Sequence, residues 1–172
     1  MRMRRSLSLL AAVSVAAVFS AACSTESPVG TSAKQIKQLP TTQLTGPFLG
    51  LVPTREDVKT RLSEQDANAY IDEVGLYALR DGERLEATLQ VSKLSDKARP
   101  EDTAFQQQVA NQIGGTKVQS FVMGGRTVYR SSLRKQSLTS WFRGDYFMIL
   151  AVRDTYDTPR ALLRVLLNEV AT

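Results

Sequence analysis

Apolar and polar residues alternate over several stretches between residues 74 and 153, as they do in strands that bury one face. The clearest alternation covers residues 85–91, where every second residue is apolar and the residues between are Glu, Thr and Gln. An apolar stretch at 74–80 precedes it, and Asp81-Gly82 offers the left-handed dihedral angles of a two-residue type I′ turn. We predict a hairpin whose solvated face carries Arg84, Glu86, Thr88 and Gln90.

Two more pairs of strands follow, each around a glycine-containing turn. Residues 116–123 and 126–132 flank Gly124-Gly125, and residues 138–143 and 146–153 flank Gly144-Asp145. Residues 147–152 are apolar without interruption, which favours a strand covered on both faces over an edge strand. We therefore expect the last strand to lie in the middle of the sheet.

Helical spacing appears in three places. Thr54 is a plausible N-cap for a helix to about residue 63, and Pro100 suits the first turn of a helix that ends at Gly114-Gly115. A last helix begins at Pro159 after a capping Thr158, and we expect it to dock near Ile149 and Leu150 through Leu162, Leu166 and Val170. The order of elements predicts an α+β fold, in which an antiparallel sheet built from hairpins carries about three helices.

The amino terminus has the pattern of an export signal. A basic segment at residues 1–5 precedes a 13-residue apolar run at 7–19, which is shorter than the roughly 20 residues of a spanning helix. The sequence Ser20-Ala21-Ala22-Cys23 then resembles the lipobox of bacterial lipoproteins. The resemblance implies that diacylglycerol is attached to the Cys23 thiol and that the chain is cleaved before Cys23. Small residues at Ser20 and Ala22 also suit ordinary secretion of a soluble protein.

The lipobox resemblance sets the expected organisation and location. Residues 1–22 are a lipoprotein signal peptide, residues 23–53 are a lipidated cysteine with a flexible tether, and residues 54–172 are a single α+β domain. As a coil, residues 24–46 of the tether span about 26 Å. The apolar residues 48–52 are expected to pack on the domain. The protein is then expected outside the cytoplasm, anchored through Cys23 to a membrane of a bacterial cell envelope.

Composition removes many kinds of chemistry. The 172 residues include no histidine and a single cysteine, which excludes zinc fingers, histidine metal sites and Ser-His or Cys-His catalysis. Three of the 22 basic residues and none of the 17 acidic ones lie in residues 1–22, so the net charge of +5 is not evidence of nucleic-acid binding. We expect no catalysis, no cofactor, no metal and no nucleic-acid partner.

Basic residues concentrate between positions 126 and 153: Arg126, Arg130, Arg134, Lys135, Arg143 and Arg153. Arg126 and Arg130 are four residues apart on one proposed strand and therefore share a face. With Arg143 they form a possible contact for anionic headgroups or an acidic cell-wall polymer, or else a solvated face. We expect the aromatic residues of the same strands either to line a ligand cleft or to form cross-strand pairs in the core. They are Tyr129, Trp141, Phe142, Tyr146 and Phe147.

Two functions fit these features best. The leading hypothesis is a noncatalytic envelope lipoprotein whose domain binds or positions an envelope protein or polymer. The alternative is a carrier or sensor of a small or lipidic ligand held between sheet and helix, and an enzyme is third. A deep apolar cavity favours the carrier, a filled core with an exposed patch favours the binding module, and converging carboxylates favour the enzyme.

Overall fold

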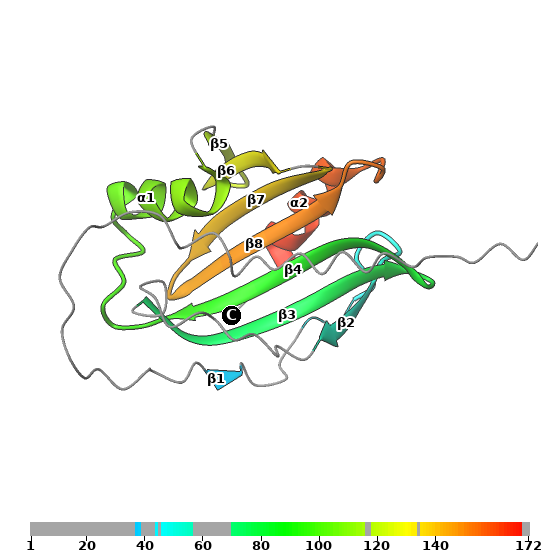
Figure 1. The fold of residues 1–172 in the computed structure, drawn as a ribbon, viewed down its shortest axis with the longest axis horizontal. Helices are drawn as coiled ribbons and strands as arrows, with labels where there is room; N and C mark the ends of the chain where they lie inside the picture. The colour runs from blue at the N-terminus through cyan, green and yellow to red at the C-terminus, as the bar shows by residue number, and fades with distance from the viewer. Residues whose placement is uncertain are drawn as a thin grey trace, which may run out of the picture.

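The computed structural model describes residues 37–38, 44, 46–56, 70–115, 118–133 and 135–169. Within these ranges the chain forms one sheet and two helices (Figure 1). The elements in chain order are β1 Lys37–Gln38, β2 Val52–Glu56, β3 Ile71–Asp81, β4 Arg84–Leu94, α1 Thr103–Gly114, β5 Gln119–Met123, β6 Arg126–Leu133, β7 Gln136–Arg143, β8 Tyr146–Arg153 and α2 Pro159–Glu169.

The sheet has the strand order β1-β3-β4-β8-β7-β6-β5, and β2 also pairs with β3. The seven strands β2 to β8 run antiparallel to their partners, whereas the two-residue β1 pairs with β3 in parallel. The prediction of an α+β fold built from hairpins is confirmed. The expected central strand is β8, which lies between β4 and β7 and is apolar because both of its faces are buried.

Helix α2 packs on one face of the sheet, behind β7, β8 and β4 in the view of Figure 1. Its leucines 162, 163, 166 and 167 are buried in one cluster with Trp141, Met148 and Leu150. The prediction that α2 docks near Ile149 is wrong, because successive side chains of a strand point to opposite faces and Ile149 belongs to the cluster on the other face. The predicted contact of Val170 lies outside the described residues.

Helix α1 lies against the other face, next to β6 and β7. Its buried residues Val109, Ala110 and Ile113 join a second cluster with Phe147 and Ile149 of β8. The helix begins three residues after Pro100, because the side chain of Asp102 accepts a hydrogen bond from the Ala104 amide at 2.8 Å and so caps it. Apolar clusters thus lie on both faces of the sheet, and α1 covers only the part of its face next to β6 and β7.

The predicted helix after Thr54 is wrong where the structure describes it. Residues up to Glu56 form β2, which pairs antiparallel with β3 and places Thr54 opposite Ala78. A cap contributes about 1 kcal/mol to a helix, whereas a strand beside β3 satisfies successive backbone groups through the ladder. The remainder of that prediction, residues 57–63, lies outside the described residues.

Part of the segment assigned to the tether belongs to this fold. Phe48 and Leu51 are buried in the cluster beneath α2, as expected, whereas Leu49 and Val52 of the same apolar stretch are exposed. They close a tight turn, in which the Phe48 amide donates to the Leu51 carbonyl at 2.9 Å and the Leu51 amide donates to the Phe48 carbonyl at 3.0 Å. β1 and β2 also add to β3, so the packed region begins upstream of Thr54.

The first predicted hairpin forms, with two differences. Asp81 pairs with Arg84, so the turn consists of Gly82 and Glu83 and not of Asp81-Gly82. We expected Glu86 to lie on a solvated face of this hairpin, but its side chain is buried and the residue is only 4% exposed. Its Oε1 lies 2.7 Å from the Arg84 Nε in an ion pair that stabilises the buried carboxylate, whereas its Oε2 has no hydrogen-bond partner among the described residues.

Candidate functional site

The three candidate arginines lie on the face of the sheet that α2 covers. β6 pairs with β7 so that Val128 lies opposite Trp141 and Arg130 lies opposite Thr139. Because residues two apart share a face, Arg126 and Arg130 lie on the same side as Val128, and Arg143 lies on the same side as Trp141. The structure therefore brings Arg126, Arg130 and Arg143 to one face, which the sequence established only for the first two.

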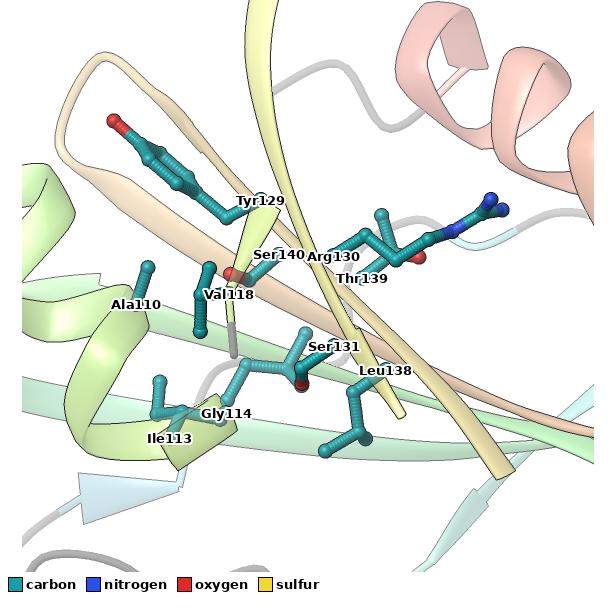
Figure 2. Close-up of a pocket in the computed structure, with 11 residues that line it drawn as sticks. Ala110, Ile113, Gly114, Val118, Tyr129, Arg130, Ser131, Leu138, Thr139 and Ser140 are labelled. Carbon is teal, nitrogen blue, oxygen red and sulfur yellow. The ribbon is translucent and has the colours of Figure 1, made fainter. Parts of the chain in front are cut away.

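Arg130 extends over the neighbouring strand β5. Its Cζ lies 5.7 Å from the centroid of the Phe121 ring, within the range of a cation–π interaction. Figure 2 shows Arg130 pointing to the opposite side of the sheet from Tyr129. Arg126 and Arg130 are half-buried, and their Nε atoms have no hydrogen-bond partner among the described residues. Part of the donor capacity of this arginine pair is thus unused.

The turn between β5 and β6 fixes this arrangement. Gly124 and Gly125 both have positive φ angles, 58° and 74°, as a type I′ turn requires, and other residues adopt this pair of angles at a cost. The two-residue turn places Met123 opposite Arg126, Phe121 opposite Val128 and Gln119 opposite Arg130. Phe121 is therefore a diagonal neighbour of Arg130, within reach of its long side chain.

The strand β5 forms an edge of the sheet. Among the described residues it pairs only with β6, and it contains neither a charged residue nor a proline. Val122 is 74% exposed, which is unusual for a large apolar side chain in a strand. We call β5 together with Arg126 and Arg130 the β5 edge.

The aromatic residues do not line a common cleft. Trp141 is buried in the cluster under α2, whereas Tyr129, Phe142 and Phe147 are buried in the cluster on the side of α1. Phe142 and Phe147 are directly opposed on β7 and β8, and their ring centroids are 4.5 Å apart. The interpretation as core residues and cross-strand pairs is confirmed for these four.

A small cavity lies between α1 and the strands β6 and β7 (Figure 2). Its volume is about 10 Å³, which is room for about one water molecule. Gly114 contributes to the close packing here, since a Cβ on it would lie 2.5 Å from the Ser131 Oγ. The cavity is therefore too small for an organic ligand.

Tyr129 borders this cavity and gives a pH-dependent prediction. Its hydroxyl donates to the Gln106 Oε1 at 3.1 Å, and burial raises its pKa above the ordinary value of 10.0. Between that value and the higher folded-state pKa, the folded protein retains a proton that the unfolded chain loses, so stability should fall as the pH rises. Below pH 10 this contribution is complete.

We expect urea unfolding to show a smaller loss of stability between pH 8 and pH 11 for Tyr129→Phe than for the wild type. Other groups titrate in this range in both proteins, so the difference between the two losses isolates Tyr129. Loss of the hydrogen bond to Gln106 lowers the variant's stability at both pH values and cancels in that difference. Equal losses would contradict the prediction.

Other predicted residues are placed as follows. Arg143-Gly144-Asp145 is a hairpin turn, as predicted, with Gly144 at a φ of 51°. Lys135 and Arg153 are exposed. Cys23 and Arg134 lie outside the described residues. Phe121 and Val122 were not among the candidate residues predicted from the sequence, although the register that a two-residue Gly-Gly turn imposes places Phe121 diagonally from Arg130.

Within the described ranges, no helix is both long enough and apolar enough to cross a lipid bilayer.

Protein-family models, curated protein sequences and solved structures all give no match to this chain.

Proposed function

We propose that this protein is a lipoprotein of a bacterial cell envelope, anchored through Cys23, whose α+β domain is a noncatalytic binding module. The sequence Ser20-Ala21-Ala22-Cys23 after an apolar run supports the anchor. The binding role rests on one observation, the half-buried arginine pair Arg126 and Arg130 on the outermost hairpin of the sheet. The partner is an anionic component of the envelope.

The packing of the domain favours binding at its surface over binding in its interior. Pockets for small ligands typically measure about 300 to 1,000 Å³. The cavity beside α1 has a volume of about 10 Å³, and packed apolar side chains fill the space between α2 and the sheet. A carrier of a small or lipidic ligand is therefore the weaker alternative.

The chemistry of the arginine pair suits an anion. A guanidinium group presents several N–H donors in a rigid fork that matches carboxylate and phosphate oxygens. Arg126 and Arg130 are held by the β5–β6 hairpin, and their Nε donors are unused by the described residues. Those Nε atoms are buried, so an anionic partner would meet the remaining N–H donors of the two half-buried side chains, which lose less side-chain entropy on binding than fully exposed arginines.

This proposal predicts binding that depends on salt and on the arginines. The chain from residue 23 onward, carrying Cys23→Ala so that no acyl group masks the effect, should cosediment with anionic vesicles or purified cell wall at low ionic strength. Changing Arg126, Arg130 and Arg143 to Gln should weaken this binding, since each charge near an anionic membrane contributes about 1 kcal/mol. High salt should weaken the wild type similarly.

A matched control removes three positive charges elsewhere. Lys97, Arg99 and Lys135 are exposed outside the β5 edge, so changing all three to Gln lowers the net charge equally. The control should retain most of the binding. No binding at low salt, or binding that both triple variants weaken equally, would remove the site from this proposal.

A further inference from the structure

Alternate residues of β5 direct their backbone groups away from the sheet. A two-residue turn is flanked by a hydrogen-bonded pair, here Met123 and Arg126, and such pairs recur at every second residue. Phe121 and Gln119 thus bond to β6 through their backbones. The N–H and C=O groups of Ser120 and Val122 point outward, where the described residues provide no further strand.

This edge lacks the features that usually prevent strand pairing. Natural sheets protect their edges with charged side chains, proline, bulges or a covering element. Gln119–Met123 contains no charged residue or proline, its pairing with β6 has no register shift, and Val122 is 74% exposed. An extended polypeptide has the backbone groups that complement this edge.

The charge beside the edge selects the side chains of the added strand. The guanidinium of Arg130 lies over the ring of Phe121, a β5 residue, so its charge lies next to the side chains of β5. A strand added to β5 would lie about 4.8 Å farther out, and its residue opposite Phe121 would project on the same face as Arg130. A carboxylate at that position would reach the guanidinium.

We propose that the β5 edge binds an extended, acidic polypeptide segment, which adds to the sheet as a further strand with a carboxylate facing Arg130. This inference deepens the proposed function, on which it rests, by naming a polypeptide as the anionic partner. The added strand would bond to the backbone of Ser120 and Val122 and would cover the side chain of Val122. Backbone pairing supplies part of the affinity, and Arg130 supplies the preference for acid.

A second copy of this chain fits the edge less well. Antiparallel pairing of two β5 strands around a twofold axis would keep both α2-covered faces on the same side. The arginine pairs of both copies would then share one face of the joined sheet, but the β5 strand added by the second copy has no carboxylate to meet them. Charge therefore favours an acidic partner.

The test measures binding of a fluorescent nine-residue peptide, with Glu at alternate positions and Val or Thr between, to the full-length chain extracted in a neutral detergent. Fluorescence anisotropy should show saturable binding that is stronger than for the same peptide with Gln in place of Glu. Methylating every backbone nitrogen of the Glu peptide should abolish binding, because the charge remains while the N–H donors are lost.

Protein variants test the two parts of the site separately. Val122→Pro removes one outward N–H and should weaken binding by roughly tenfold, whereas Val122→Thr retains that N–H and should stay within about twofold. Arg130→Gln should remove the preference for Glu over Gln. Ser120→Pro removes the other outward N–H and serves as a second proline variant if Val122→Pro does not fold.

Three results would overturn the inference. The first is that the Glu peptide does not bind. The second is that its methylated form binds equally well, which would mean that only charge is recognised and would leave the proposed function in place. The third is that the chain forms a dimer that Val122→Pro dissociates, which would mean that a second copy covers the edge. Saturable binding that is lost on methylation and weakened by Val122→Pro and Arg130→Gln would establish it.

Discussion

Leu166→Ala should lower the free energy of unfolding by about 2 to 5 kcal/mol. Leu166 is 0% exposed and belongs to the cluster in which α2 meets Trp141, Met148 and Leu150. Removing three side-chain carbons there forfeits their burial and leaves a cavity that rigid strands on the other side cannot fill. The sheet keeps its hairpins, but α2 loses a central contact.

Denaturant unfolding followed by the fluorescence of Trp141 is a direct measurement, because the chain has a single tryptophan and it lies in this cluster. Arg164→Ala is the matched control, since Arg164 is exposed on the same helix and its replacement should change stability by less than about 0.5 kcal/mol. An unfolding midpoint for Leu166→Ala equal to that of the wild type would show that this face of α2 is not buried.

Cys23→Ala should abolish the mature form of the protein in the membrane fraction. The wild-type chain is expected as a shortened protein that sediments with membranes and is released by detergent. Two acyl chains give lasting attachment, each buried methylene contributing about 0.8 kcal/mol, whereas one chain binds only marginally. Without the thiol, neither diacylglycerol transfer nor cleavage before residue 23 can follow, so uncleaved precursor or released protein is expected.

Fractionation with immunodetection gives both the location and the size of the product. Ser24→Ala changes the adjacent residue and leaves the thiol intact, so it should behave as the wild type does. Retention of a mature-sized Cys23→Ala product in membranes would contradict the prediction. Retention of a product of precursor size would not, because an uncleaved apolar segment also holds a chain in the membrane.

The sequence by itself determined the strands and helices in which local pattern and long-range packing agree. Residues 146–153 form β8 with the bounds expected, because an uninterrupted apolar run requires cover on both faces. Pro159 begins α2, since proline at a first helical position and a leucine face favour the same structure. The turns at Gly124-Gly125 and Gly144-Asp145 follow from dihedral angles that few residues adopt.

Where a local preference competed with pairing to a distant segment, only the tertiary structure determined which conformation the residues adopt. Residues up to Glu56 form β2 because the edge of β3 pairs with them, and no property of residues 54–56 reveals that edge. Glu86 is buried, although it alternates with apolar residues as a solvated residue would. In the candidate site, the face shared by Arg126 and Arg130 was predictable from a period of two.

The position of Arg143 on that face and the exposure of the β5 edge depended on strand order, which pairing across the whole sheet determines. A period of two residues assigns side chains to faces within one strand but does not say which strand lies beside it. The sequence thus determined the hairpins and two of the three arginines. The order of the hairpins in the sheet, which leaves β5 at its edge, depends on pairing between strands distant in sequence, which no local pattern specifies.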